Sequence, residues 1–453
     1  MTLAIAAALA SPAHALDLVD VWRAAATHDA DFAAARAAHA AGIARRTQAG
    51  TLWRPGLTLE AGAGLATNDT AARGAQFSAP GFGQTAGVAF DTSINNGTSS
   101  RIVLALRQPL LSREREVQQR QLELAAEIAE VQWQDAQQAL MRRAAERYFD
   151  TVLADEQLRV LERQQAAVDR ARTEAQDRFR IGDRPVTDIH EASARAAGLT
   201  AQRLAAQTEL ALKRAALADL SGLAVEAARM PLPRPARSSA TPSGPLESWL
   251  DEAARGNPGL RLAELQVRSA EQDARKTSAA LSPTVDVVAQ IGRERLSGNG
   301  DFGHASNTAS NRAIGVQMSV PLYTGGLRSA RQTEALALID KAGAELESMR
   351  RQAALQTRGA WLELSVGLGR SEALEAALTA SRARLDATRV GLRAGDRTTL
   401  DLLNAENDAA AAELALMQAR AHLLLDELRL AALAGRLDEA RLQHVNAALQ
   451  PLP

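Results

Sequence analysis

Apolar and polar residues alternate with the period of an α-helix over much of the chain. Between Ser112 and Phe179 there is no Gly or Pro, and apolar or small side chains recur three and four residues apart, with charged residues between them. They are Ala129, Trp133, Ala136, Leu140, Ala144, Tyr148 and Val152. A continuous helix of this length spans roughly 100 Å, at about 1.5 Å per residue. Its face of small and apolar residues predicts close packing against neighbouring helices.

The helical pattern returns in the second half of the chain. Residues 326–393 predict a second helix of similar length. Shorter helices are expected before and after each long one, at about residues 18–52, 188–220, 246–280 and 400–434. Two short helices laid end to end match one long helix, which predicts long antiparallel coiled coils.

Two segments, residues 55–109 and 283–321, break the helical pattern. They are rich in Gly, Ser, Thr and Asn, and their apolar residues recur at every second position, which is the period of a β-strand. Each segment predicts a hairpin of two half-apolar strands of about eight or nine residues, with a long, flexible tip. The apolar faces consist of Leu57, Leu59, Ala61, Ala63, Leu65, Ile102, Leu104, Leu106, Val285, Val287, Ala289, Ile291, Ile314, Val316, Met318 and Val320.

A turn after the first long helix is repeated after the second. The sequence RIGDRPVTD begins at Arg180, and LRAGDRTTLD begins at Leu392. Gly182 corresponds to Gly395, and Asp188 corresponds to Asp401. The glycines predict backbone turns that favour a positive φ. The matching charge pattern indicates that the chain arose by internal tandem duplication.

The order short helix, hairpin, long helix, turn and short helix therefore occurs twice. Repeat 1 is expected at residues 16–222, with its hairpin at about 55–109, its long helix at 112–179 and the following helix at 188–220. Repeat 2 is expected at residues 246–435, with its hairpin at about 283–321, its long helix at 326–393 and the following helix at 400–434. A Pro/Ser-rich linker at 223–245 separates them, and residues 436–453 form a C-terminal tail.

The first residues resemble a secretory signal peptide. An apolar run from Leu3 to Ala10 is followed by the small-residue site Ala13-His14-Ala15, which predicts a signal peptide at residues 1–15 and cleavage before Leu16. The alternative is an Ala-rich helix start. No later stretch reaches the roughly 18 uncharged apolar residues of a transmembrane helix.

Composition and motifs exclude several classes of function. Lys and Arg number 52 against 53 Asp and Glu, so no basic surface for nucleic acid is expected. There is no Cys, and therefore no disulfide, thiolate metal site or thiol nucleophile. The stretch HEASA at His190 lacks the second histidine of a zinc protease helix, GFGQTAG at Gly81 lacks dinucleotide-binding spacing, and no Walker motif is present. No catalytic residue, cofactor or metal is expected.

Four half-apolar strands cannot form a closed sheet by themselves. An open sheet leaves unpaired backbone groups at its edges, and in lipid each such group costs several kcal/mol. Three chains would supply twelve strands, enough for a transmembrane barrel with a passage, so a homotrimer is expected. Trp53 before the first strand and Tyr323 after the last are placed to hold the membrane interface. A strand of a soluble sheet could show the same pattern, and this alternative remains open at this point.

The complete pattern resembles the TolC-type outer membrane channel family. The resemblance covers nearly the whole chain after residue 15, and its sharpest marks are RFRIGDRPVTDIHEASARA, VPLYTGG at Val320 and GLRAGDRTTLDLLNAEND. It implies a mainly helical fold in which a trimeric, twelve-stranded β-barrel continues into a long α-helical tunnel. The motif GDRTTLDLL and the absence of Cys resemble the unlipidated, TolC-like branch.

The resemblance also implies a role for the repeated turns, as the closed periplasmic entrance of the tunnel. Asp401 corresponds to an entrance aspartate ring, and Arg397 to a linking residue whose partners match Thr187 and Asp188. Asn404 stands where a second aspartate ring would be, which predicts a weaker acidic filter. Leu392 stands where a linking tyrosine is usual, which predicts fewer closing links. The alternative reading of Asp188 and Asp401 is helix capping, and both roles can hold at once.

These features together predict a passive, gated exit duct in the outer membrane, with its helical tunnel in the periplasm. The expected partners are a periplasmic adaptor (membrane fusion protein), an inner membrane ABC or proton-driven transporter, and outer membrane lipid. The cargo would be secreted polypeptides in a type I secretion system or small toxic molecules in a tripartite efflux pump. The alternative function is that of a soluble periplasmic coiled-coil adaptor or scaffold.

Overall fold

The computed structural model describes residues 16–81, 83–183, 185–225, 230–233, 244–301, 303–323 and 325–450. The predicted signal peptide, Arg184 of the repeated turn and most of the predicted linker lie outside this part of the chain. The described residues form two compact units. One unit comprises residues up to 42 together with 127–267 and 341–453, and the other comprises residues 43–126 and 268–340. The boundary between the units falls within α2, α3, α6 and α7.

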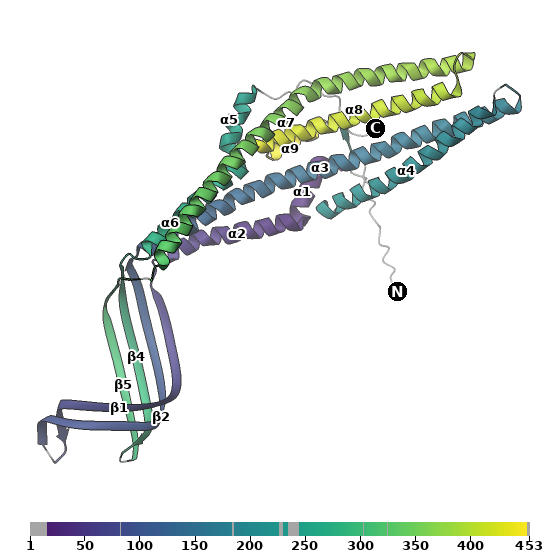
Figure 1. Cartoon of the computed structure of the whole chain (residues 1–453). Coiled ribbons are helices and arrows are strands. Elements are labelled where there is room, and N and C mark those ends of the chain that lie inside the picture. Colours follow the sequence, from purple (N-terminus) through teal and green to yellow (C-terminus); the bar gives the residue numbers. More distant parts are fainter. Residues whose placement is uncertain are drawn as a thin grey trace, which may run out of the picture. The chain divides into compact units, whose positions relative to one another are not determined.

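The second unit contains a four-stranded antiparallel sheet. Its strands are β1 (Gly56–Ala79), β2 (Gly83–Leu111), β4 (Thr284–Gly300) and β5 (Gly303–Ser319), in the order β1-β2-β4-β5. The two hairpins therefore meet through β2 and β4, which lie next to each other although they come from different repeats (Figure 1). Within the described residues, the outer edges of β1 and β5 have no strand partner.

The predicted strand lengths are wrong. The strands have 24, 29, 17 and 17 residues, because the Gly-, Ser-, Thr- and Asn-rich segments that were expected as flexible tips continue the ladder. Ladder hydrogen bonds join backbone groups, and a polar side chain does not prevent them. Register shifts occur between Ala66 and Asn68 on β1 and between Asn95 and Thr98 on β2. Beyond these shifts the β1–β2 hairpin turns away from β4 and β5, as β-bulges allow (Figure 1).

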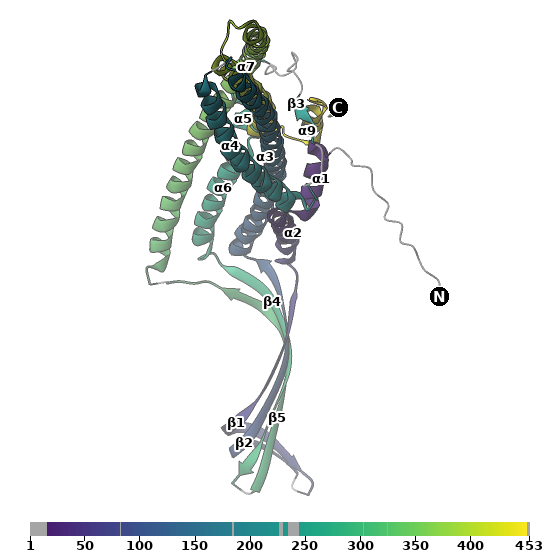
Figure 2. The same cartoon turned by 90° about the vertical axis from the view of Figure 1, so that its right-hand side faces the viewer.

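The predicted apolar face of the sheet is present. Residues 56–66 of β1 pair with β2 without a register shift, and so do β4 and β5 along their whole length. Leu57 thus faces the same way as its partner Leu106, and Ile314 as its partner Ala289. These side chains are not covered within the described chain: Leu57 is 64% exposed and Ile314 is 81% exposed. Figure 2 shows the strong twist of the four strands.

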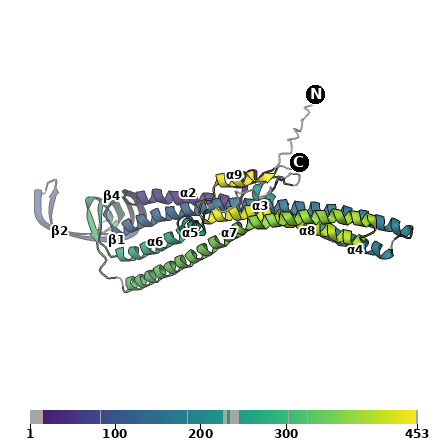
Figure 3. The same cartoon turned by 90° about the horizontal axis from the view of Figure 1, so that it is seen from above.

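The predicted fold class, mainly helical with a small antiparallel β part and an internal duplication, is confirmed. The long helices α3 (Arg113–Arg180) and α7 (Leu327–Ala394) have 68 residues each. In the first unit α3 pairs with α4 (Val186–Ser221), and α7 runs beside α8 (Thr399–Leu433), as Figures 1 and 3 show. Among the described residues, no helix has a stretch apolar enough, over a sufficient length, to cross a membrane.

The helical stretches expected at residues 18–52 and 246–280 are each two helices. The first consists of α1 (Leu18–His28) and α2 (Ala30–Thr51), and the second of α5 (Leu246–Gly256) and α6 (Pro258–Ala279). The breaks lie at Asp29 and Asn257, at corresponding positions of the two repeats. Each side chain accepts a hydrogen bond from a backbone N–H of the following first turn, from Phe32 at 2.8 Å and from Leu260 at 3.1 Å. The breaks are therefore stabilised by helix caps.

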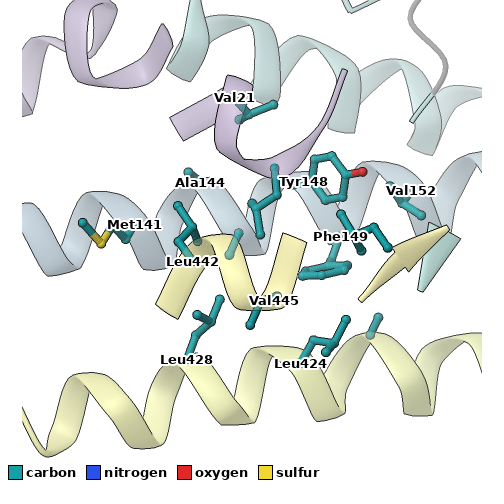
Figure 4. Packing of buried hydrophobic residues seen from close by; sticks show 14 of the residues in the cluster. Val21, Met141, Ala144, Tyr148, Phe149, Val152, Leu424, Leu428, Leu442 and Val445 are labelled. Atoms are coloured by element: carbon teal, nitrogen blue, oxygen red, sulfur yellow. The ribbon is translucent and has the colours of Figure 1, made fainter. Parts of the chain in front are cut away.

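The largest hydrophobic cluster lies in the first unit, where the beginning and the end of the described chain meet α3 and α8. Figure 4 shows Val21 of α1, Tyr148 and Phe149 of α3, Leu428 of α8 and Leu442 of α9 (Glu439–Ala447) pointing toward one another. The rings of Tyr148 and Phe149 meet edge to face, with 5.4 Å between their centroids. Such contacts between segments distant in sequence hold the two repeats together in this unit.

A short strand pair and polar contacts close this cluster. The strand β3 (Leu232–Pro233), within the predicted linker, pairs with β6 (Leu449–Gln450) near the end of the chain. The Tyr148 hydroxyl donates a hydrogen bond to the carbonyl of Pro231 at 3.0 Å. Asn446 of α9 accepts from the Leu18 N–H at 3.1 Å and donates to the Asp17 carboxylate at 2.9 Å. The linker segment is thus fixed to α3 by one hydrogen bond, and α9 is fixed to the start of α1 by two.

We predict that Tyr148→Phe lowers the midpoint of thermal unfolding by about 1–2 °C. The substitution leaves the buried carbonyl of Pro231 without its donor, which costs about 1–2 kcal/mol. The other tyrosine of the chain, Tyr323, is 88% exposed, and Tyr323→Phe is the matched control, with an expected change below about 0.5 °C. Unfolding of both variants is followed by tryptophan fluorescence. Equal midpoints for the two variants would show that the Tyr148 hydroxyl does not stabilise the cluster.

Candidate functional site

The two repeated turns have the same backbone geometry. In the first, Gly182 has a φ of 80° and Asp183 donates its N–H to the carbonyl of Arg178 at 2.9 Å. In the second, Gly395 has a φ of 85° and Asp396 donates its N–H to the carbonyl of Gly391, also at 2.9 Å. Both turns are helix C-caps in which the glycine takes the left-handed conformation and satisfies carbonyls at the end of the long helix. The glycines predicted from the sequence therefore lie at the ends of α3 and α7.

The two turns differ in how the next helix begins. Thr398 caps α8, since its hydroxyl accepts from the Asp401 N–H at 3.1 Å while the Asp401 carboxylate accepts from the Thr398 N–H at 2.9 Å. This reciprocal pair is a capping box. At the start of α4 the corresponding residue is Pro185, which has no side-chain hydrogen bond to offer. The duplicated aspartate Asp188 is thereby left available for another contact.

Asp401 is both a helix cap and a half-buried negative charge. Its carboxylate also accepts from the Thr398 hydroxyl at 2.9 Å. The Thr398 N–H and hydroxyl lower the pKa of Asp401 below its usual value, because they stabilise the ionised form. The capping role weighed in the sequence analysis is therefore present, and it keeps the carboxylate charged.

Asp188 links the two helical hairpins of one chain. Its carboxylate accepts a hydrogen bond from the hydroxyl of Thr399, the first residue of α8, at 3.2 Å. Leu403, one turn further along α8, is buried in a cluster of α3 and α4 residues that includes Leu161 and Leu199. The tip of repeat 2 is thus attached to repeat 1 by one polar contact and one apolar contact. No sequence motif indicates Thr399, because its buried side chain meets Asp188 only in the folded chain.

The remaining predicted gate residues have no partner of this kind within the described chain. Arg397 is exposed and packs against Gly391, where an added Cβ would lie 2.7 Å from the Arg397 Cγ. No ion pair joins its guanidinium to a carboxylate of the described residues. Thr187 and Asn404 are exposed, and Leu392 is buried. Arg397 and Thr187 therefore remain available for contacts outside the chain.

A second set of contacts joins the hairpins further from the turns. Arg163 of α3 lies 3.1 Å from the carboxylate of Glu413 on α8, and Arg382 of α7 lies 3.3 Å from the same carboxylate. Arg163 also contacts the buried Glu156 at 3.5 Å. Burial raises the pKa of Glu156, and the neighbouring arginines only partly oppose this effect. These residues are far apart in sequence and carry no motif, so sequence reasoning could not find the network.

The two predicted interface aromatics have different environments. The indole N–H of Trp53 donates to Gln119 at 3.1 Å, and the ring is half-buried. Tyr323 has no hydrogen-bond partner among the described residues and is almost fully exposed. Both side chains lie next to the helix-side ends of the strands, at β1 and β5 respectively.

A hollow in the first unit shows no arrangement suited to catalysis. It has a volume of about 620 Å³ and lies between α7 and α8, lined by Glu363, His422, Asp426 and Arg429 among others. Burial raises the pKa of Asp426, and Glu363 adds to this effect. In the part of the chain that the structure describes, no group of His, Asp and Glu side chains could hold a metal ion. His190 of the HEASA stretch is an exposed residue of α4.

Comparison with known proteins agrees with this fold. The model of the outer membrane efflux protein family matches residues 21–223 and 249–436. The outer membrane protein TolC of Vibrio cholerae is 28% identical, over 72% of this chain and 75% of its own length. The proteases secretion protein PrtF of Dickeya chrysanthemi is 27% identical, over 80% of this chain and 79% of its own length.

A solved structure shows the same fold. The outer membrane protein VceC of Vibrio cholerae aligns with a TM-score of 0.72 at 19% identity, covering 92% of this chain and 96% of VceC. The matched family consists of outer membrane channels and not of enzymes, which confirms the prediction of a non-catalytic role and favours the channel over the soluble adaptor. Since the family model covers both repeats, the chain belongs to the outer membrane efflux protein family.

Proposed function

We propose that the chain forms a homotrimeric exit duct of the outer membrane, passive in itself and gated at the tips of its two helical hairpins. Membership in the outer membrane efflux protein family supports the location and the class of function. The trimer, the gate and the partners are inferred from the geometry of the chain. Each of them rests on a separate observation, given below.

The sheet carries the proposal. Its outer strands β1 and β5 lack partners within the described chain, and its apolar face, which includes Leu59 and Val316, is largely exposed. The unpaired edges and the exposed apolar face would both be satisfied if three sheets closed side by side into a barrel of twelve strands in a bilayer, where lipid covers the apolar face. Two sheets would give eight strands, whose interior is filled by side chains. Three is the smallest number that leaves a passage.

The duct requires partners that supply energy. The sequence contains no nucleotide-binding motif, so export must be driven by a transporter system to which the duct connects. One matched relative is named for protease secretion, and the family is named for efflux. The proposed partners are therefore a periplasmic adaptor and an inner membrane transporter, of the ABC or proton-driven type. The cargo is either a polypeptide or a small toxic molecule.

The gate is proposed at the repeated turns. Three copies of Asp401 would form an acidic ring, which attracts cations into a narrow entrance. Among the described residues Arg397 has no carboxylate partner, and it would reach Asp188 or Thr187 of a neighbouring chain. Leu392 and Asn404 would add no ionic link and no second acidic ring. The resting gate would therefore be held by a few weak contacts.

Tyr323 and Trp53 are proposed to lie at the periplasmic border of the bilayer. Tyr323 is exposed beside the end of β5, where a ring with a polar hydroxyl suits the interface. Trp53 already donates its N–H to Gln119, so it would hold the strand end to α3 as well. The outer membrane lipid is thus a partner of the sheet and of these two rings.

The proposed function is tested by fractionation and by the phenotype of a deletion. We expect the protein in the outer membrane fraction, extracted by detergent as trimers that dissociate only on heating. Release by osmotic shock as a monomer would contradict the proposal. Deleting the gene should either increase drug susceptibility or remove proteins from the secreted set, and this outcome also identifies the cargo.

We predict that Asp401→Asn reduces the cation preference of the channel in planar bilayers. The amide oxygen can still accept from Thr398, so the helix cap is largely kept while the charge of the ring is lost. The measurement is the reversal potential in a salt gradient. Asp251→Asn, at an exposed position of α5, removes one carboxylate elsewhere and should leave the reversal potential unchanged. An Asp401 variant with wild-type selectivity would limit the residue to capping.

We predict that Arg397→Ala raises the conductance of the resting channel. Three exposed links of about 0.5 kcal/mol each would, when lost together, shift the ratio of closed to open channels by about ten-fold. The matched control is Arg393→Ala, which removes an exposed arginine four residues earlier, at the end of α7. If both variants conduct like the wild type at rest, Arg397 does not hold the gate.

A further inference from the structure

Three arginines follow directly after the apolar positions of the β4–β5 hairpin. The register pairs Ile291 with Arg312, and beyond it Arg293 pairs with Ser310 and Arg295 with Thr308. The pairing has no shift between Thr284 and Gly300, so side chains two residues apart face the same way. The face that carries Val285, Val287, Ala289 and Ile291 on β4, and Met318, Val316 and Ile314 on β5, therefore continues into Arg293, Arg295 and Arg312.

The three arginines form one cluster. Arg295 lies two residues from Arg293 on the same strand, about 7 Å away, and Arg312 lies on the diagonal from Arg293, about 7–8 Å away. All three side chains are exposed. Like charges at these distances repel one another, so the cluster is unfavourable unless an anion compensates it.

No carboxylate compensates the cluster on its own face. The positions of β4 and β5 that face the same way are apolar, hydroxyl-bearing, Asn or His residues, and no ion pair in the described part of the chain involves these arginines. The opposite face of the sheet differs, because there Arg101 of β2 is registered directly across from Glu294 of β4. The arginine charge is thus compensated by a carboxylate on the opposite face of the sheet and is uncompensated on the apolar face.

The residues beyond the arginines are hydroxyl-bearing. Ser297, Ser306, Thr308 and Ser310 continue the same face toward the hairpin tip, and the Ser297 hydroxyl lies 3.1 Å from a ring nitrogen of His304. Three zones therefore follow one another along the face: apolar side chains, arginines and hydroxyls. This is the order of acyl chains, phosphates and sugars in a phosphorylated glycolipid that stands upright in a bilayer.

The cluster lies on the tip side of the apolar zone. The helices join the sheet at the other side, since β2 ends at Leu111 just before α3, and β4 begins at Thr284 just after α6. Figure 2 shows β4 and β5 extending together from these ends to the tip between Gly300 and Gly303. If the helical tunnel stands in the periplasm, the arginines lie at the level of the outer leaflet.

We propose that Arg293, Arg295 and Arg312 bind the phosphate groups of a phosphorylated glycolipid in the outer leaflet of the outer membrane. The guanidinium group binds phosphate oxygens through two parallel hydrogen bonds, and its charge persists at any pH of the cell. The neighbouring hydroxyls bind the sugar headgroup, and Ile291 and Ile314 contact the acyl chains. This inference rests on the proposed membrane-spanning trimer.

The test uses full-length protein extracted as trimers in a mild detergent. The variant carries Arg293→Gln, Arg295→Gln and Arg312→Gln, and the matched control carries Arg101→Gln on the opposite face. Copurified glycolipid is quantified by mass spectrometry, and rebinding is measured with the phosphorylated glycolipid, its dephosphorylated form and phosphatidylglycerol. We expect the triple variant to retain about ten-fold less glycolipid than the wild type and the control, since two or more charge-assisted contacts are lost.

Several outcomes would overturn the proposal. These are equal retention by the triple variant, equal binding of the dephosphorylated form, and equal binding of phosphatidylglycerol. A normal heat-dissociable trimer band accompanied by any of these results would overturn the glycolipid site alone. The absence of wild-type trimers from the outer membrane would overturn the proposed duct and the glycolipid site together.

Discussion

The unpaired backbone of a β-sheet edge is the constraint on which the rest of this structure depends. Two hairpins from the two repeats meet through β2 and β4, but β1 and β5 are left as edges within the described chain. A sheet of this kind, with an exposed apolar face, is an aggregation hazard in water and is unsatisfied in lipid unless other copies complete it. The exposure of residues such as Leu65 and Ile314 has the same origin. Closure by sister chains would satisfy the edges and place the apolar face against lipid, and the passage would follow from the number of strands.

Duplication supplies the parts of the proposed gate, and divergence between the copies gives the two turns different contacts. Gly182 and Gly395 keep the same turn, because both long helices must end with a backbone conformation that glycine adopts at little cost. Pro185 in place of Thr398 removes one helix cap, and this single difference releases Asp188 from its own helix. The released carboxylate accepts from Thr399 and connects the hairpins, whereas Asp401 remains a cap with a lowered pKa. Two identical turns would both be capped in the same way, so neither aspartate would be free to connect the hairpins while the other contributes to the proposed acidic ring.

The fold could be predicted from the sequence because its signals are long and periodic. The absence of Gly and Pro over residues 112–179 predicts one long helix, and the period-two pattern around Leu57 recurs in the second repeat. The strand lengths could not be predicted, since the polar tips pair through backbone groups that the side-chain pattern does not report. The pair β3–β6 is two residues long and shows no pattern. Contacts such as Thr399 with Asp188 and Arg163 with Glu413 depend on the packing of separate helices, which a single sequence does not reveal.

Both ends of the proposed duct carry charges that are not compensated within the described chain. The chain is nearly neutral, with a formal net charge of −1, yet its charges are placed unevenly. At the helical turns, hydrogen bonds favour the ionised form of Asp401, and Arg397 has no carboxylate partner in the part of the chain that the structure describes. On the outer part of the sheet, three arginines face the same way without a carboxylate. A single unpaired charge on an exposed surface costs little free energy in water, but three neighbouring charges of one sign repel one another and are unfavourable. In a trimer, each of these groups of uncompensated charges would occur three times around one axis. A neighbouring chain, an ion or a lipid would bind most favourably at these surfaces, because there it would supply the opposite charge.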